Sequence, residues 1–281
     1  MMPNAVQVPL AITSLQDIAQ DYDAVFCDVW GVLHNGVSKF APAEAALCDM
    51  RASGRPVVLV TNSPRRSHSV AMFLSSIGIS PDAFDAIATS GDVTRALIKA
   101  APSRLFHIGT EAHRELLDGL EVDLVGEDDA KTVLVTGLFD DNRETPADYA
   151  ALLGRLAERR LPMICANPDI VAQRGDRMVW CAGALARDYA ARGGDVQLAG
   201  KPFAPIYDFA AGRIGGIDGR RVLAIGDGLA TDIKGANDYG LDALLILEGI
   251  HADALGDDPA SVAAYLEREA LSARYAMATL R

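Results

Sequence analysis

The sequence predicts an α/β fold, with a doubly wound parallel sheet and a second α/β block inserted into it. Short apolar runs alternate with helical segments along the chain, which is the pattern of parallel strands joined by crossover helices. Several of these runs stop at a polar residue, and near Ile87 the strand–helix pattern starts again. Half of the 281 residues are hydrophobic, which is enough to build a full core.

The first part of the chain is expected to form two right-handed strand–helix units. A buried strand over 24–29 delivers Asp28 to its carboxyl end. The Asn35-Gly36 pair favours a type I′ turn, so a small hairpin that carries His34 is predicted just beyond this strand. The further elements expected here are a helix over 42–52, a strand over 56–60 and a helix over 67–77.

The rest of the chain divides into an inserted block and a return to the first sheet, because no Pro/Ser-rich linker separates them and two short hinges suffice. The expected core is 1–85 and 195–281, and the inserted α/β domain is 86–194. Strands of the block are predicted over 105–108, 132–136 and 162–166, and helices over 92–100, 113–120, 148–160 and 183–192. After it we expect strands over 196–199, 221–225 and 243–247, helices over 206–214 and 261–275, and a helix through 236 that Thr231 and Asp232 cap.

The net charge of −12 argues against nucleic acid or an anionic membrane surface as a partner, since both need a basic face. No signal peptide and no apolar run of membrane-spanning length is evident. The four cysteines lack CxxC spacing, which fits a reducing compartment, so a cytoplasmic protein is expected. Four of the histidines, His68, His107, His113 and His251, show no metal-ligand spacing and are expected to be surface or satisfied polar residues.

Polar residues at the ends of four apolar runs indicate phosphoryl-transfer chemistry. The runs end at Asp28, at Thr61-Asn62, just before Lys201 and at Asp227, and parallel strands align their carboxyl ends at one edge. Asp28 and Asp227 can hold Mg²⁺, which prefers oxygen ligands. Lys201 and Thr61 can neutralise and hydrogen-bond phosphoryl oxygens, and Asp28 can attack phosphorus.

These segments resemble the four ordered motifs of the haloacid dehalogenase (HAD) superfamily of phosphatases. The resemblance covers nearly the whole chain and is greatest to the type IIA branch, the nitrophenyl-phosphatase and phosphoglycolate/pyridoxal phosphatase relatives. Asn167-Pro168-Asp169, followed by the helix at Gly183, resembles a cap segment of that branch. The matching motifs are Asp28-Val29-Trp30-Gly31-Val32-Leu33, Val60-Thr61-Asn62-Ser63, Gly200-Lys201-Pro202 and Gly226-Asp227-Gly228-Leu229-Ala230-Thr231-Asp232-Ile233.

The resemblance implies a Rossmann-like core and a magnesium site. By it, Asp28 is the nucleophile and a metal ligand, and Asp227 is a second ligand. Asp232 either binds the metal or accepts a hydrogen bond from a metal-bound water. Trp30 would contribute only its backbone carbonyl to the metal.

The resemblance also implies how a small phosphorylated metabolite is held. Thr61 and Lys201 would bind the phosphoryl group, with help from Asn62. The inserted block would be a cap that closes over the substrate, with Asn167 and Asp169 on a substrate-facing loop. Caps of this branch often pair two subunits, so a homodimer through the cap is a further expectation.

Trp30 departs from the motif, because hydrolytic relatives usually have an Asp there as general acid and base. Three interpretations stay open. His34 reaches the leaving group and replaces the missing acid; Trp30 stacks on an aromatic or sugar-like substrate, or packs in the core; or the protein is a slow or non-catalytic phospho-ligand-binding, regulatory protein. The leading hypothesis is a Mg²⁺-dependent phosphohydrolase working through an aspartyl-phosphate, with reduced activity. Substrate identity cannot be derived from the sequence.

Overall fold

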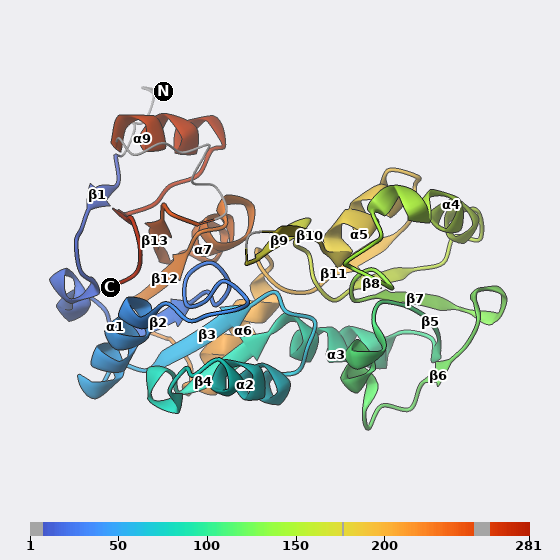
Figure 1. Ribbon diagram of the computed structural model, residues 1–281, viewed down its shortest axis with the longest axis horizontal. Coiled ribbons are helices and arrows are strands. Elements are labelled where there is room, and N and C mark those ends of the chain that lie inside the picture. The colour runs from blue at the N-terminus through green and yellow to red at the C-terminus, as the bar shows by residue number, and fades with distance from the viewer. Residues whose placement is uncertain (1–7, 176, 250–258) are drawn as a thin grey trace. The chain divides into compact units, whose positions relative to one another are not determined.

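The computed structural model describes residues 8–175, 177–249 and 259–281, which form two compact units (Figure 1). Unit 1 is built from the described residues of Met1–Val60, Phe73–Ile87 and Tyr207–Arg281. Unit 2 is built from those of Thr61–Met72 and Ala88–Ile206. Each contains a parallel sheet with helices, which confirms the predicted fold class. The domain boundaries at residues 86 and 194 stay a prediction.

A seven-stranded sheet organises unit 1, in the order β1-β14-β13-β12-β2-β3-β4. The pairings from β1 through to β3 are all parallel. Every side chain of β2 is buried, as expected for a central strand of a parallel sheet covered on both faces. The strands are β1 Leu10–Ala11, β2 Ala24–Cys27, β3 Val57–Thr61, β4 Ala86–Thr89, β12 Val222–Gly226, β13 Asp242–Ile246 and β14 Tyr275–Met277.

The prediction of a final helix over 261–275 is confirmed for its first half and is wrong beyond it. Helix α9 ends at Arg268, because Ala270 adopts a positive φ of 54° and the Leu271 N–H bonds back to the Leu266 carbonyl at 2.8 Å. The chain then enters β14, which the sequence did not predict. The helices with residues in unit 1 are α1 Ala41–Ala52, α2 Ser67–Ser76, α6 Ala204–Arg213, α7 Lys234–Tyr239 and α9 Pro259–Arg268.

A five-stranded parallel sheet organises unit 2, in the order β11-β8-β7-β5-β6. An antiparallel hairpin of β9 and β10 follows β8 and was not predicted from the sequence. The strands are β5 Arg104–Ile108, β6 Asp123–Leu124, β7 Thr132–Val135, β8 Met163–Cys165, β9 Val171–Arg174, β10 Arg177–Trp180 and β11 Val196–Leu198.

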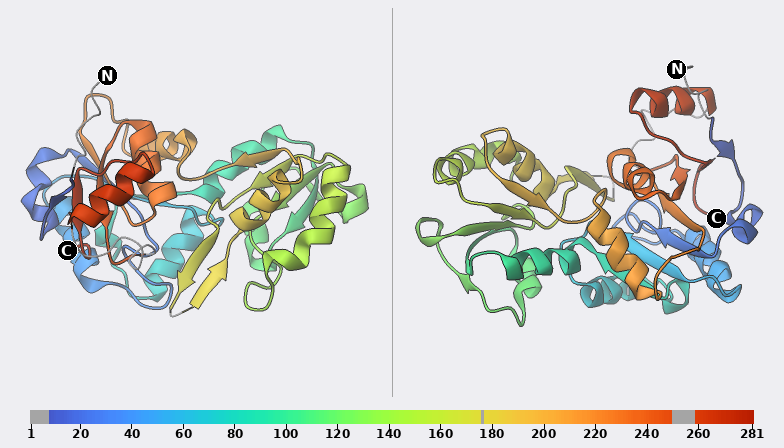
Figure 2. Two further views of the ribbon diagram at one scale, coloured as in Figure 1. Left: turned by 90° about the horizontal axis from the view of Figure 1, so that it is seen from above. Right: turned by 180° about the vertical axis from the view of Figure 1, so that it is seen from behind.

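Helices cover both faces of this second sheet, and the strand side chains alternate between them. Val133 and Val135 pack with α4 (Ala150–Glu158) and α5 (Ala182–Ala190) on one face. Leu134, between them, packs with α3 (Ser90–Ala100) on the other face, where a 3₁₀ helix replaces the α-helix predicted over 113–120. Figure 2 shows the helices on either side of this sheet. No helix in the described part of the chain has both the length and the apolar character needed to cross a membrane.

Candidate active site

Three carboxylates gather where two central strands of unit 1 end. Asp28 directly follows β2, and Asp227 directly follows the neighbouring β12. Asp232 comes from the helical turn after β12. Each offers a carboxylate oxygen that lies within 4.8 Å of the others, and the three residues are only 5–7 % exposed. Parallel pairing of β2 with β12 therefore produces the convergence of Asp28 and Asp227 expected from the sequence.

The turn that holds Asp232 differs from the sequence prediction. We expected Thr231 and Asp232 to cap a helix, but Leu229–Ile233 already forms a wide π turn that continues into α7, and Gly228 precedes it. Asp232 thus lies inside the turn, where its Oδ2 accepts a hydrogen bond from the Gly228 N–H at 3.0 Å. The π turn places the carboxylate back toward the end of β12 instead of at the helix start, consistent with the frequent use of such turns at functional sites.

The backbone of the first motif, residues 28–33, approaches the carboxylate cluster closely at Gly31. Its φ is +85°, a conformation that side-chain-bearing residues rarely adopt, and a Cβ built there would lie 2.3 Å from Asp227 Oδ2. A glycine is therefore required at this position both by the backbone and by the space beside Asp227.

The donor set fits a hard divalent cation. Three buried carboxylates at this separation repel each other, and all three offer the oxygen ligands that Mg²⁺ and Ca²⁺ take. A bound dication would offset that repulsion. The residues present therefore fit a magnesium site, to which Asp28, Asp227 and Asp232 would contribute side chains; Trp30 lies two residues beyond Asp28.

The residues expected to hold the phosphoryl group belong to unit 2, and Asn62 connects three of its segments. Its Oδ1 accepts a hydrogen bond from the Lys201 N–H at 2.7 Å. Its Nδ2 donates to Asp169 Oδ1 at 2.8 Å and to the Lys201 carbonyl at 3.2 Å. Asn62 and Lys201 are 4 % and 3 % exposed. One amide side chain therefore joins the second motif, the third motif and the Asn167–Asp169 segment.

Thr61 and Asn167 have local roles in the same unit. Thr61 is the last residue of β3, and its Oγ1 accepts a hydrogen bond from the Ser63 N–H at 3.2 Å. The Asn167 side chain accepts one from the Asp169 N–H at 3.0 Å, which shapes the turn after β8. The predicted substrate-binding residues are thus brought together around Asn62 and Asp169, apart from His34, which belongs to unit 1.

Comparison with known proteins decides the family. Residues 25–123 match a family model described as haloacid dehalogenase-like hydrolase, and residues 198–268 match a second one described as HAD-hydrolase-like. A crystal structure of a haloacid dehalogenase-like hydrolase from Brucella suis 1330 is 48% identical, with a TM-score of 0.88, over 96% of this chain and 100% of that one. The chain belongs to the haloacid dehalogenase-like hydrolases.

Two further similar proteins are phosphatases. The D-glycerol 3-phosphate phosphatase of Mycobacterium tuberculosis is 27% identical over 259 residues, which are 90% of this chain and 71% of the relative. A crystal structure of a glycerol phosphate phosphatase from the same organism, in complex with calcium, is 26% identical, with a TM-score of 0.65, over 87% of this chain and 76% of that one. The superfamily and the branch predicted from the motifs are confirmed.

In this HAD hydrolase, contacts between aromatic rings hold the loop after Asp28 in place. Trp30 and His34 meet edge to face with ring centroids 5.1 Å apart, and His34 meets Phe73 of α2 in the same way at 5.4 Å. A Cβ on Gly36 would lie 2.5 Å from the Trp30 ring. The Trp30 ring therefore packs inside its own loop. Phe73 was missed from the sequence because nothing local to it marks a partner so far along the chain.

The tip of this loop is not the predicted type I′ turn. That turn needs a positive φ at both central residues, and Gly36 has one (+84°) whereas Asn35 does not. The Asn35 side chain instead accepts hydrogen bonds from the Val37 and Ser38 N–H groups, at 3.1 and 2.9 Å, as asparagine often does in turns. A single antiparallel bridge between His34 and Lys39 closes the loop in place of a hairpin.

His34 is 1 % exposed, and its Nδ1 accepts a hydrogen bond from the Gly36 N–H at 2.8 Å. Burial lowers the pKa of His34 to about 4, so the ring is neutral at physiological pH with its proton on Nε2. This environment favours a packing role. The acid–base role considered from the sequence stays a hypothesis. Of the other histidines, His68 is exposed, His107 and His113 are hydrogen-bonded, and His251 lies outside the described residues.

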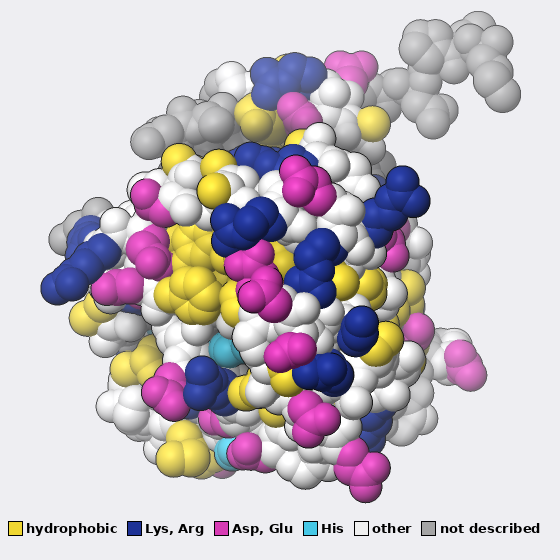
Figure 3. Space-filling view, turned by 90° about the vertical axis from the view of Figure 1, so that its right-hand side faces the viewer, with side chains coloured by type: hydrophobic (Ala, Val, Ile, Leu, Met, Phe, Trp, Pro, Cys, Tyr) yellow, Lys and Arg dark blue, Asp and Glu magenta, His cyan; other side chains and the backbone are white. Residues whose placement is uncertain are grey.

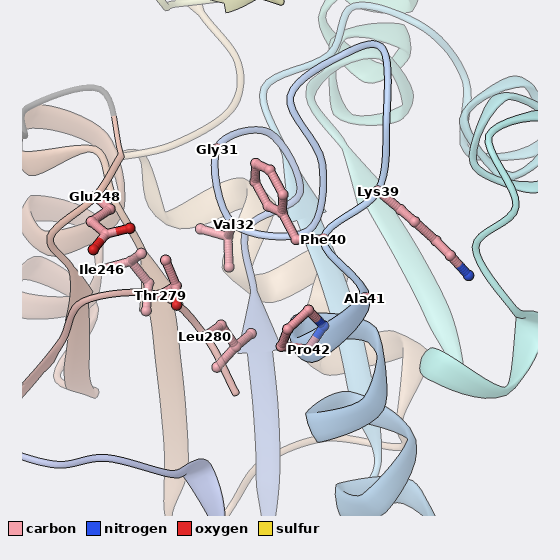
Figure 4. Close-up of a pocket in the computed structure, with 10 residues that line it drawn as sticks. All are labelled: Gly31, Val32, Lys39, Phe40, Ala41, Pro42, Ile246, Glu248, Thr279 and Leu280. Carbon is pink, nitrogen blue, oxygen red and sulfur yellow. The ribbon is translucent and has the colours of Figure 1, made fainter.

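A pocket of about 440 Å³ in unit 1 borders the same loop (Figure 4). Its lining is mainly apolar, and Lys39 points away from it to pair with the Glu44 carboxylate. Gly31 lines this pocket as well as approaching Asp227, so it separates an apolar space from the carboxylate cluster. The lining residues are Gly31, Val32, Lys39, Phe40, Ala41, Pro42, Ile246, Glu248, Thr279 and Leu280.

Proposed function

We propose that this chain is a Mg²⁺-dependent phosphohydrolase that cleaves a small phosphorylated metabolite through an aspartyl-phosphate on Asp28. The observation that carries the proposal is the cluster of three buried carboxylates at the ends of β2 and β12. Family membership supports hydrolysis of phosphoric esters, and the two Mycobacterium tuberculosis phosphatases named above act on glycerol phosphate by their names.

In the proposed reaction, Asp28 attacks phosphorus with one carboxylate oxygen while the ester P–O bond breaks. The leaving alkoxide takes a proton, and water then attacks the aspartyl-phosphate to release inorganic phosphate and regenerate Asp28. Thr61 and Lys201 bind phosphoryl oxygens by hydrogen bonding and charge. A bound Mg²⁺ would supply positive charge to the phosphoryl oxygens and to the Asp28, Asp227 and Asp232 carboxylates.

Trp30 determines which leaving groups suit this enzyme. Its indole has no proton to exchange at neutral pH, and the ring packs against His34 and Gly36. Positioned acid–base catalysis contributes about 10²–10⁴-fold, so this part of the rate is missing unless another group supplies it. We therefore propose a preference for leaving groups that depart without a proton, such as aryl or acyl phosphates.

The presence of Trp30 where an acid is expected also favours a second candidate, a protein that binds a phosphorylated ligand and turns it over slowly or not at all. Such a protein would keep the metal site and Lys201 while lacking the acid. Ligand binding without turnover would distinguish it from the leading proposal.

The test is hydrolysis of p-nitrophenyl phosphate and a panel of phosphorylated metabolites, with MgCl₂ and with EDTA. Activity should require Mg²⁺, and Asp28→Asn should abolish it. Asp49→Asn, an exposed carboxylate on α1, is the matched control and should be fully active. Activity that persists in Asp28→Asn would exclude Asp28 as the nucleophile, and binding without turnover on any substrate would favour the second candidate.

Trp30→Asp tests the missing acid directly. If the acid alone is lacking, this variant should hydrolyse alkyl phosphates about 10²-fold faster or more, with a smaller gain on p-nitrophenyl phosphate. Equal rates of the variant and the wild type on alkyl phosphates would show that another group already supplies the proton.

We propose further that the protein is cytoplasmic, binds neither nucleic acid nor membrane, and pairs into a homodimer through the cap. On the face of the molecule in Figure 3, basic and acidic side chains are interspersed and positive charge does not accumulate. The net charge of −12 supports the same view. Light scattering after gel filtration tests the dimer: a monomeric mass at micromolar concentration would contradict it.

A further inference from the structure

The sheet of unit 2 has its own switch point, between β5 and β7. The chain runs from β5 to β6 on one side and then returns to place β7, β8 and β11 on the other side. In doubly wound sheets, ligands bind beyond the carboxyl ends of the strands at the point where the order reverses. Here β5 and β7 are in register from Leu105 with Thr132 to Ile108 with Val135, so Gly109 and Thr136 follow side by side.

A cluster of two histidines and a threonine occupies this switch point. The Thr136 Oγ1 lies 2.8 Å from His107 Nε2 and 3.2 Å from His113 Nδ1. Gly109 leaves the space for it, since a Cβ there would lie 2.0 Å from Thr136 Oγ1. Thr136 and His107 are buried, and His113 is partly exposed. Thr136 therefore holds both rings, and His113 offers the accessible edge of the cluster.

The cluster leaves two ring nitrogens for a ligand, and at least one of them is an acceptor. Both rings are neutral, because burial lowers the pKa of His107 to about 4 and also lowers that of His113. The Thr136 hydroxyl has one proton, which it can donate to a ring nitrogen or to the Ile108 carbonyl, 3.5 Å away. When a ring receives it, the second nitrogen of that ring carries a proton and that of the other does not; when the carbonyl receives it, both second nitrogens are acceptors. Within the described chain, neither second nitrogen has a hydrogen-bond partner.

Each arginine that acts on the two rings is paired with a carboxylate. Three arginines lower the histidine pKa values, and two carboxylates raise that of His113. The pairs are Arg65 with Glu115 at 3.2 Å, Arg174 with Asp141 at 2.6 Å and Arg114 with Glu111 at 3.2 Å. An anionic or cationic ligand group gains no net attraction here, whereas a neutral group that both donates and accepts hydrogen bonds is complementary.

We propose that His107 and His113, positioned by Thr136, form a specificity site for hydroxyl groups and bind the polyol or sugar part of the substrate. This inference rests on the proposed phosphohydrolase function. Lys201 follows β11 at the same edge of the same sheet, and β11 is two strands from β7, or about 10 Å at the usual strand spacing. A phosphorylated polyol would thus place its phosphoryl group at Lys201 and a distal hydroxyl at His113. As an alkyl ester it would gain affinity from these contacts but turn over more slowly than an aryl phosphate, because Trp30 replaces the acid.

The test compares substrates with and without hydroxyl groups. His113→Asn keeps an amide at the position of Nδ1, so it can still bond to Thr136, but it lacks Nε2. We expect it to lower kcat/KM for sorbitol phosphate about 10-fold to 100-fold, and to leave that for p-nitrophenyl phosphate within about twofold. Thr136→Val should act in the same way, and Thr136→Ser should restore the selectivity. Thr132→Val is the matched control, because Thr132 is a buried threonine at the opposite end of β7 that bonds to the Pro102 carbonyl.

Equal losses of kcat/KM on both substrates, or no loss on either, would overturn the specificity site, as would a selectivity change in Thr132→Val. Titration calorimetry on the Asp28→Asn variant, which should not hydrolyse substrate, distinguishes failure of the hydroxyl site from failure of the phosphohydrolase proposal. There, sorbitol phosphate should bind more tightly than phenyl phosphate, and His113→Asn should abolish the difference. If the wild type hydrolyses nothing but this binding pattern holds, the phosphohydrolase proposal fails and the hydroxyl site stands. If sorbitol phosphate binds no more tightly than phenyl phosphate, the hydroxyl site fails.

Discussion

Replacing Asp232 by Asn should change stability in opposite directions with and without a divalent metal. The three carboxylates lie within 4.8 Å of one another and are buried. At 4.8 Å and an effective dielectric constant of 20, each pair of charges repels by about 3.5 kcal/mol. Asp232→Asn removes two of the three pairs, or about 7 kcal/mol of repulsion before any relaxation. Because water and nearby groups relax around the charges, we expect an increase of about 2 kcal/mol in the free energy of unfolding without metal.

A bound divalent metal should reverse which of the two proteins, wild type or Asp232→Asn, is the more stable. A ligand present at 100 times its dissociation constant stabilises a protein by about 2.7 kcal/mol, and the wild type receives this in full. The variant has lost one ligand atom and receives less. In EDTA the variant should therefore unfold about 4–8 °C above the wild type, and in saturating MgCl₂ at or below it.

Scanning calorimetry or near-ultraviolet circular dichroism in the two buffers measures both differences. The Asn side chain can still accept the hydrogen bond that the Gly228 N–H gives to Asp232, so the local turn is preserved. Asp238→Asn is the control: it breaks an exposed pair with Lys234, and its effect should stay within about 0.5 kcal/mol in both buffers. A variant less stable than the wild type in EDTA would refute the view that repulsion dominates the empty cluster.

Three other substitutions test separate parts of the structure. Gly31→Ala should weaken Mg²⁺ binding about tenfold or more in titration calorimetry, because its Cβ meets Asp227 and its φ is positive; unchanged affinity would contradict this. Asn62→Asp removes two donated hydrogen bonds and sets a carboxylate against Asp169, so urea unfolding should show a loss of about 2–4 kcal/mol; an unchanged midpoint would count against it. The pKa of His34 falls from 6.5 to about 4 on folding, so its stabilisation is complete above pH 6.5 and is lost as the pH falls towards 4, by about 2 kcal/mol at pH 5. His34→Asn, which can still accept from Gly36, should remove this part of the pH dependence; parallel curves for variant and wild type would exclude it.

The convergence of Asp28 and Asp227 could be predicted from sequence because it depends on local features. Each follows a continuous apolar run, and parallel strands place such positions at one edge. The same rule applied to unit 2 would have found Thr136, which follows the apolar run of β7, and the His107–Gly109 end of β5. These signals are weaker, because a threonine after a strand is common whereas a carboxylate is not.

Other features depend on partners distant in sequence, and no local pattern predicts them. The packing of His34 depends on Phe73, which approaches it only through the tertiary fold. The strand β14 is short and follows a helix, and it is fixed by pairing with β1 and β13. Asp232 was placed at a helix start because a π turn has no sequence signature that separates it from an α-helical one.

The order of strands in unit 1 has a consequence for how the protein folds during synthesis. Strand β12 lies between β2 and β13, so β2 lacks its neighbour on that side until residues 222–226 have been made, 161 positions after β3 ends at residue 61. At about 5–20 residues per second the ribosome needs roughly 8–30 s for this stretch. During that time the apolar β2 presents an open edge, where it can pair with another chain. Nascent chains stalled inside unit 2 should therefore aggregate or recruit chaperones more than chains released after β12.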